Sequence, residues 1–173
     1  MKVTILEFPD RSDWIAVKKR ALVTVGLTSC KDPTDQWKHD ILNARHSPIR
    51  RLRFSFLLTD IPYYVSVHLC RHIHAQPYVK SQRSDRQKEQ GYIREKKAQD
   101  EPVTMIWDMG GEELLTVFNK RLCGCADPTT RKLVRMIADA VIERDPIYKP
   151  FAVPMCKYLG RCPEMFPCKE CKP

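Results

Sequence analysis

The sequence of 173 residues has no long run of apolar side chains. Its longest such stretch, residues 54–58, is broken by Ser55 and is far shorter than the ~20 residues that a membrane-spanning helix needs. Charged residues also interrupt the first thirty positions, which therefore contain no apolar core of a secretory signal peptide. We expect a soluble, cytoplasmic protein with no membrane partner.

Cysteine is present, but not in the density of a secreted disulfide scaffold. Eight cysteines are too few for that class in a chain of this length. In a reducing compartment they are expected to be thiols or metal ligands. The sequence also has no internal repeat, and its length is that of one ordinary domain.

The composition is that of a basic globular protein. Hydrophobic residues make up 43% of the chain and charged residues 29%, which excludes a disordered chain. Lysine and arginine number 30 against 21 acidic residues, so the formal net charge is +9. This excess favours an anionic partner, such as a nucleotide, a nucleic acid or a phosphorylated cofactor.

Hydrophobic periodicity predicts short strands mixed with longer helices. Strands are expected over residues 3–8, 53–58 and 103–107. Helices are expected over about residues 13–26, 34–42, 63–70, 114–122 and 129–143, with Asp13 as the cap of the first. A polar loop should follow the third helix, and residues 80–100 should form a charged, solvated loop or flap. The mixture predicts the α+β class.

Residues 68–83 form the most unusual stretch, because arginines, a lysine and three histidines alternate there with Ser, Gln and Tyr. Arginine binds phosphates and planar acceptors through two parallel hydrogen bonds. The stretch is therefore suited to an anionic, planar ligand, although a basic solvated surface has the same composition. A histidine metal site would be incomplete here, since no carboxylate lies nearby.

Arg71-His72, followed by Ser81-x-Arg83, resembles the signature of the flavin-dependent thymidylate synthases. The segment that begins Arg45-His46-Ser47-Pro48 and the helix that ends Asn119-Lys120-Arg121 agree with the same family in order. The resemblance covers roughly residues 35–145. It implies a flavin-dependent thymidylate synthase-like domain with a small antiparallel sheet at residues 1–149, and a Cys-rich tail packed on it at residues 150–173.

The resemblance also implies a function. In that family FAD lies between the subunits of a homotetramer, NADPH reduces it, and methylenetetrahydrofolate supplies the carbon that converts dUMP to dTMP. Arg121, Ser81 and Arg83 would be the catalytic and substrate-binding residues, and Arg71, His72 and His74 would contact the flavin. The source would be prokaryotic or a phage.

Several positions depart from the family pattern. Ile73 stands where the family has a third motif residue, Arg, and Gln76 stands where it has Ser. Glu112 and Thr116 stand where it has flavin-binding Arg and Asn. A related deoxypyrimidine nucleotide or a different one-carbon unit therefore stays open. A non-catalytic, zinc-containing protein that binds nucleotides or nucleic acid is the alternative function.

The tail cysteines predict a metal site. Cys168-x2-Cys171 has the spacing of a zinc knuckle, and the tail has little apolar material with which to fold alone. The cysteines of some family relatives imply a Zn²⁺ site built from Cys123, Cys156, Cys162 and Cys168, with Cys125 and Cys171 in reserve. An iron–sulfur cluster and free thiols are the alternatives.

Overall fold

A computed structural model describes residues 1–29, 31–87 and 91–169. Its strands are β1 (Lys2–Glu7), β2 (Arg53–Pro62), β3 (Ala75–Val79) and β4 (Pro102–Gly110). Its α-helices are α1 (Arg11–Val23), α2 (Asp35–Asn43), α3 (Tyr63–Cys70), α4 (Gly111–Arg121), α5 (Pro128–Arg144) and α6 (Met155–Leu159). Short 3₁₀ turns are η1 (Ser47–Arg51), η2 (Ser84–Arg86), η3 (Arg94–Lys96) and η4 (Pro146–Tyr148). The α+β class predicted from the sequence is confirmed.

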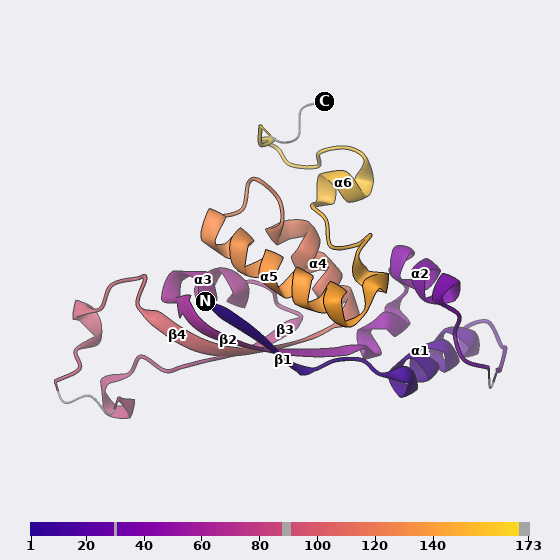
Figure 1. Cartoon of the computed structure of the whole chain (residues 1–173), viewed down its shortest axis with the longest axis horizontal. Helices are drawn as coiled ribbons and strands as arrows, with labels where there is room; N and C mark the ends of the chain where they lie inside the picture. The colour runs from indigo at the N-terminus through magenta and orange to yellow at the C-terminus, as the bar shows by residue number, and fades with distance from the viewer. Residues whose placement is uncertain (30, 88–90, 170–173) are drawn as a thin grey trace.

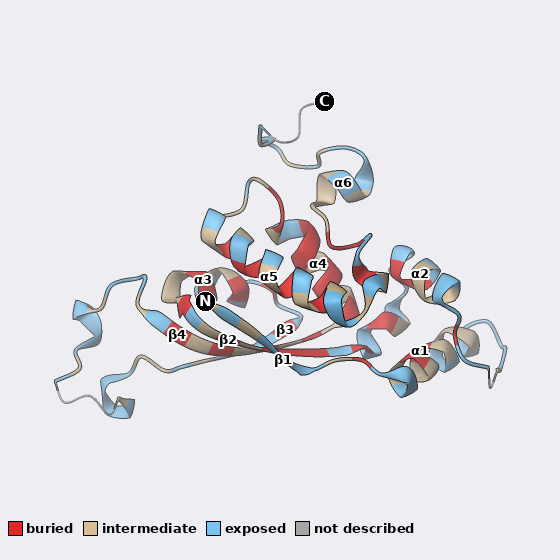
Figure 2. Cartoon of the chain, viewed as in Figure 1, coloured by how far each residue is buried: buried red, intermediate tan, exposed pale blue. Residues whose placement is uncertain are grey.

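The four strands form one antiparallel sheet in the order β1-β2-β4-β3. Helices α3, α4 and α5 cover one face of it, and α1 and α2 lie beyond the end of the strands (Figure 1). Buried side chains of the sheet face the inner sides of α4 and α5, where Figure 2 shows the core. Along β4 every second residue is buried, as expected for a strand with one covered face.

The structure corrects two local predictions. Asp13 is not the cap of α1: Asp10 is, because its side chain accepts from the backbone N–H groups of Ser12 and Asp13. Asp13 completes a capping box from the first turn. Residues 75–79, predicted as polar loop, form β3. Pro77 is tolerated there because β3 is an edge strand.

Two glycines let η1 approach the junction of β4 and α4 closely. A Cβ atom on Gly110 would lie 2.8 Å from the carbonyl oxygen of Arg50, and one on Gly111 would lie 2.8 Å from that of Ile49. Real Cβ atoms are not found so close to backbone, so larger residues would push η1 away. The glycines thereby fix η1 and its arginines beside the first turn of α4.

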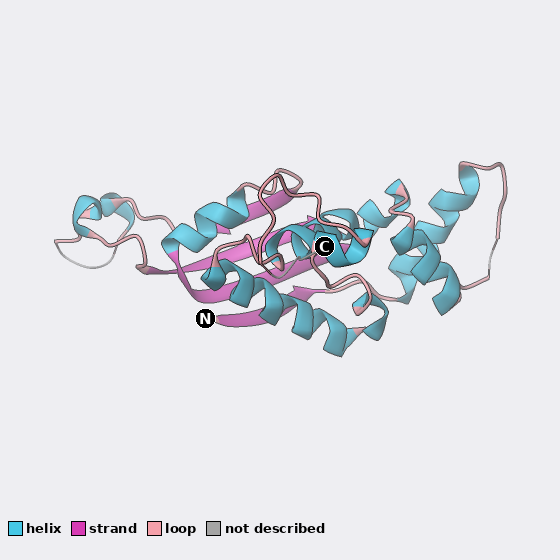
Figure 3. Cartoon of the chain, turned by 90° about the horizontal axis from the view of Figure 1, so that it is seen from above, coloured by secondary structure: helices cyan, strands magenta, loops and turns pink. Residues whose placement is uncertain are grey.

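A long connection between β3 and β4 projects from the end of the sheet, with η2 and η3 on it (Figures 1 and 3). Within the described part of this connection the side chains are mostly exposed, as predicted for a charged flap. The tail follows α5 and carries α6, which lies above α4 in the view of Figure 1. None of the helices in the described ranges is both long and apolar enough to cross a membrane.

Candidate functional site

The ring of His72 lies between two side chains of α4. His72 follows α3 in the chain, and only 7% of its surface is exposed. Its Nδ1 lies 2.7 Å from Oε1 of Glu113, and its Nε2 accepts a hydrogen bond of 2.9 Å from Nε of Arg121. Glu113 lies in the first turn of α4 and Arg121 in the last, about two turns away, so this one ring connects the two ends of the helix. We call Arg121, His72 and Glu113 the α4 triad.

The chemistry of the triad fixes the tautomer of His72. Arginine can only donate, so Nε2 must be the acceptor, and Nδ1 carries the proton that it donates to Glu113. The ring is therefore neutral, and it also packs edge-on against Trp107 at a centroid distance of 5.8 Å. The resemblance predicted a flavin contact for His72. In this structure both ring nitrogens are already engaged, and their effect is to orient Arg121.

Arg121 is held from a second side as well. Its Nη2 donates a hydrogen bond of 2.9 Å to the carbonyl oxygen of His68, in the last turn of α3. Burial, and then the positive charge of Arg71, lower the pKa of Arg121. Arg71 is exposed and makes no ion pair with any residue that the structure describes. An anion bound near both guanidinium groups would relieve their mutual repulsion.

A capping residue ties α5 to the same region. Asp127 accepts hydrogen bonds from the backbone N–H of Thr130 at 2.8 Å and from its hydroxyl at 3.0 Å. The same hydroxyl lies 2.9 Å from Nδ1 of His68. Partial burial opposes ionisation of Asp127, but these hydrogen bonds and the nearby His68 outweigh it and lower the pKa of the carboxyl. The cap of α5 therefore also holds the turn of α3 that binds Arg121.

A cleft of ≈ 600 Å³ opens beside the triad. It is lined by Arg45, Arg50, Arg53, Ile73, His74, Gln76, Gly110, Glu112, Glu113 and Thr116. Glu112 is paired with Arg50, and Glu113 is engaged with His72. Arg53 makes no ion pair within the described part of the chain. Arginines thus outnumber carboxylates on the walls, and the cleft is suited to an anionic ligand.

Arg45 enters the cleft from a strained backbone position. Its φ of 50° lies in the left-handed region, at the end of α2 where glycine is usual. Its side chain donates to the amide oxygen of Asn119 and lies over the ring of Tyr158, 4.8 Å from the centroid. The amide of the fully buried Asn119 donates in turn to the carbonyl oxygen of Val153 at 2.7 Å. This one side chain therefore joins α2, α4 and the tail at the wall of the cleft.

Of the predicted ligand-binding residues, His74 lines the cleft, whereas Arg71, His72, Arg121, Ser81 and Arg83 are not among its lining residues. Glu113, which lines the cleft and binds His72, connects it to Arg121. Ser81 and Arg83 follow β3 on the projecting connection. The guanidinium of Arg83 pairs with Asp85 through hydrogen bonds of 2.9 and 2.8 Å, and its backbone N–H donates to the hydroxyl of Ser81 at 3.3 Å. The roles that the resemblance implies for these two residues stay predictions.

Three cysteines form a cluster between α4 and the tail. Their sulfur atoms, from Cys123, Cys125 and Cys168, all lie within 4.8 Å of one another. Desolvation, and then the thiols of Cys123 and Cys168, raise the pKa of Cys125 to about 11. Of the four predicted metal ligands, Cys123 and Cys168 are in this cluster, while Cys156 and Cys162 are not among its three members. The reserve ligand Cys125 is in it, and Cys171 lies outside the described residues.

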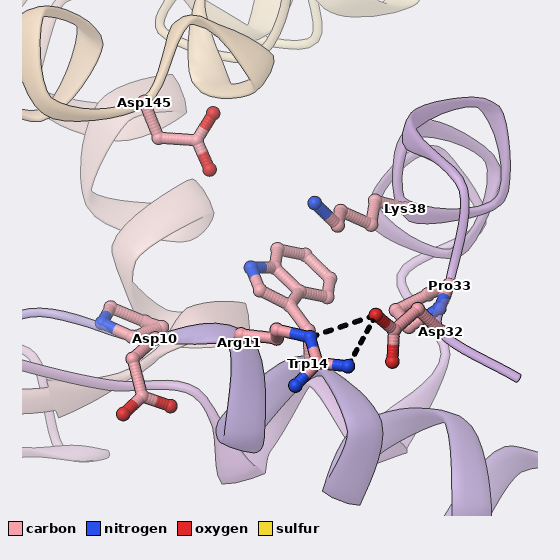
Figure 4. Close-up of a pocket in the computed structure, with 8 residues that line it drawn as sticks. Asp10, Arg11, Trp14, Asp32, Pro33, Lys38 and Asp145 are labelled. Carbon is pink, nitrogen blue, oxygen red and sulfur yellow. Dashed lines mark hydrogen bonds and ion pairs between the residues drawn. The ribbon is translucent and has the colours of Figure 1, made fainter. Parts of the chain in front are cut away.

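A second hollow, of ≈ 350 Å³, lies between α1 and α2 (Figure 4). It is lined by Pro9, Asp10, Arg11, Trp14, Asp32, Pro33, Lys38 and Asp145. Arg11 and Asp32 form an ion pair of 2.7 Å, Asp10 caps α1, and Asp145 caps η4. Lys38 pairs with a carboxylate on α2. The charged groups of this hollow are thus engaged in ion pairs and helix caps. The cleft beside the triad, which has an excess of arginine, is therefore the candidate site.

Sequence reasoning missed Glu113, Arg45 and Asn119 as site residues. Glu113 is a carboxylate directly before the apolar residues of the helix predicted over 114–122, and a charge beside an apolar run is a signal for a buried polar partner. Asn119 is a polar residue within the apolar pattern of that helix, two residues before the end of α4. Arg45 has no such signal, because its conformation becomes evident only from the backbone.

Comparison with known proteins identifies the fold. The sequence matches no protein-family model and no curated protein. Two solved structures that match are ThyX thymidylate synthase from Helicobacter pylori, and both contain FAD and dUMP. The first has a TM-score of 0.68 and 14% identity over 88% of this chain and 99% of that one. The second has a TM-score of 0.63 and 14% identity over 92% and 97%. The chain therefore has the ThyX-like fold that the motifs predicted.

Proposed function

We propose that this protein transfers a one-carbon unit from methylenetetrahydrofolate to a deoxypyrimidine nucleotide, in a reaction that depends on FAD and NADPH. The conversion of dUMP to dTMP, or a close variant, is the reaction. The observation that carries the proposal is the convergence of Arg71 and Arg121 beside a cationic cleft, in a fold shared with structures that bind FAD and dUMP.

The walls of the cleft fit the phosphate groups of FAD. Among the described residues Arg53 has no carboxylate partner, and the contacts of Arg45 there are with a neutral amide and an aromatic ring, so the charge of neither arginine is neutralised by them. Arg50 is neutralised by Glu112 and contributes less. His74 and Gln76 add hydrogen-bonding groups from the start of β3. The bound flavin would supply the hydride chemistry that the side chains here do not have.

Arg121 is proposed to bind the pyrimidine ring of the nucleotide. Two of its nitrogens are held by His72 and by the carbonyl of His68, which fixes the plane of the guanidinium. Nη1 makes no hydrogen bond with the described residues and is the nitrogen that a ligand can use. A guanidinium fixed at the O2 and N1 edge of the ring would stabilise the negative charge that develops there during the reaction.

Ser81 and Arg83 are proposed to act in the site of a second copy of the chain. They lie on a connection that projects from the sheet, whereas Arg121 lies on α4 (Figure 1). The face of the sheet opposite α4 carries a cross-strand row of Leu57, Ile106 and the exposed Tyr78, and no helix in the described ranges covers it. This row is a suitable surface for a neighbouring subunit of a homotetramer.

The test of the function is tritium release from C5-labelled dUMP in the presence of FAD, NADPH and methylenetetrahydrofolate. The purified protein should be yellow and should release tritium. Arg121→Ala should weaken dUMP binding or transition-state stabilisation by roughly 2–4 kcal/mol of free energy. Arg121→Lys should restore only part of this loss. Arg144→Ala, an exposed change at the end of α5, is the control. A colourless protein that binds DNA with a steep salt dependence would instead indicate the non-catalytic binder.

The oligomer has its own test. Light scattering on the intact protein should give a tetramer mass. A mixture of Arg83→Ala and Arg121→Ala chains should recover activity if the two residues serve one site from different subunits, because some sites then receive both native residues. An active monomer, or a mixture no more active than its parts, would refute this arrangement.

A further inference from the structure

The Cys123, Cys125 and Cys168 cluster has the geometry of a metal site. Cys123 and Cys125 lie in the turn between α4 and α5, and Cys168 comes from the tail. In a tetrahedral zinc site with Zn–S bonds of about 2.3 Å, neighbouring sulfurs are about 3.8 Å apart. The three sulfurs here lie within 4.8 Å of one another, so a small contraction would place them at the corners of such a tetrahedron.

The tail segment that carries Cys168 has little apolar burial of its own. Beyond α6 the apolar side chains Met165 and Phe166 are 86% and 82% exposed, so hydrophobic burial holds little of this segment. Contacts beside the cluster include a 3.8 Å pair between Lys120 and Glu164 and a weak hydrogen bond of 3.6 Å from the Cys125 thiol to the Phe166 carbonyl. Surface contacts of this kind contribute little free energy. A metal bound by thiolates from both segments would supply the missing stabilisation.

We propose that Cys123, Cys125 and Cys168 bind a structural Zn²⁺ that fastens the tail to the end of α4. Zinc is assigned because thiolates are its preferred ligands in structural sites and because such a site orders a segment that has no core of its own. The assignment covers these three ligands.

The site begins two residues after Arg121, and this gives it a second consequence, which rests on the proposed function. The metal would prevent the last turn of α4 from fraying. It would thereby also keep the guanidinium of Arg121 in the position that His72 and His68 define. Zinc removal should therefore weaken dUMP binding without removing any residue that touches the nucleotide. The metal measurements below do not depend on nucleotide binding, so a failure of the proposed function leaves them intact.

The experiment measures metal in the intact protein as purified. Elemental analysis should find about one zinc per chain, and replacement with Co²⁺ should give the thiolate charge-transfer and visible bands of a tetrahedral cobalt–thiolate centre. Cys125→Ser and Cys168→Ser should each lose most of the metal. Cys70→Ser is the matched control, because Cys70 is an exposed thiol on α3, outside the cluster, and it should retain the metal.

Hydrogen exchange supplies a readout for variants that fold poorly. Zinc removal by a chelator from the native protein should increase exchange at residues 155–169 and in the turn after α4, and re-addition of zinc should reverse this. Less than about 0.2 zinc per chain, stoichiometric iron, or metal loss in Cys156→Ser and Cys162→Ser with full retention in Cys125→Ser would each overturn the assignment.

Discussion

The α4 triad predicts a measurable coupling between two buried side chains. His72 and Glu113 are 7% and 8% exposed at their side chains, and their hydrogen bond is 2.7 Å long. His72→Phe keeps a ring against Trp107 but leaves the Glu113 carboxylate buried without its donor. We expect a loss of about 3 kcal/mol or more in the free energy of unfolding, because an unsatisfied buried charged group costs more than the roughly 1–3 kcal/mol of a neutral one.

The reverse change has a smaller effect. Glu113→Leu leaves only the neutral N–H of His72 unsatisfied, which costs about 1–3 kcal/mol. The double variant replaces both partners by apolar groups and should lose clearly less than the sum of the two single variants. The resulting coupling energy should be about 2–3 kcal/mol, which is within the range for directly contacting residues.

The assay is urea unfolding followed by tryptophan fluorescence and circular dichroism, with equal m-values required before free energies are compared. The exposed pair of Arg83 and Asp85 is the control, because its side chains are 60% and 59% exposed and its coupling should stay below about 1 kcal/mol. If the effects at His72 and Glu113 add to within about 0.5 kcal/mol, the hydrogen bond is not a stabilising contact and the triad is not a unit.

Three further predictions follow from local geometry. Gly111→Ala should reduce the unfolding free energy by about 1–3 kcal/mol, because its Cβ would clash with η1, whereas Lys120→Ala on the exposed side of α4 should have little effect; equal melting temperatures would contradict the close approach. Arg45→Gly should be about 1 kcal/mol more stable than Arg45→Ala in chemical denaturation, because both remove the side chain and only glycine accepts the left-handed backbone without strain. An alanine variant as stable as the glycine one would show that Arg45 is not held there. Asp127→Ala should destabilise α5 by about 1–2 kcal/mol at neutral pH through loss of the cap. The lowered pKa of Asp127 means that its contribution is complete above the unfolded value of about 4 and disappears as the pH falls through the lower folded value, so the two unfolding curves should converge in acid; a pH-independent difference would argue against a carboxylate cap.

The sequence predicted the elements that carry strong periodicity. Helices α4 and α5 were found because their apolar residues recur at helical spacing, and β4 was found because Gly110 and Gly111 end it. β3 was missed because Pro77 and its polar neighbours hide an edge strand that pairs on one side only. Hydrophobic periodicity reflects which side chains of an element are buried. An edge strand buries few side chains, so its hydrophobic pattern is weak.

The candidate site was predicted less completely than the fold. Arg71, His72, His74 and Arg121 were predicted from motifs. The structure brings His72 into contact with Arg121 and places Arg71 near it, at the ends of α3 and α4, while their roles stay predictions. Glu113 could not be assigned, because a carboxylate inside an apolar pattern has meaning only when its partner is known, and His72 lies 41 positions away. The choice between Cys125 and Cys156 likewise depends on how the tail folds back, which spacing alone does not define.

The projecting connection between β3 and β4 bears on how proteins of this fold can diverge. Pro62 pairs with Pro102, so α3, β3 and the connection all lie inside one loop that the central strands β2 and β4 close. The entropic free-energy cost of closing a loop rises only with the logarithm of its length, by about 0.6 kcal/mol for each doubling. Insertions and deletions in the connection are therefore nearly neutral for the core. Selection can change the length or the charge of this one segment, and thereby the ligands or neighbouring molecules that it contacts. The sheet, the triad and the cleft would be unaffected.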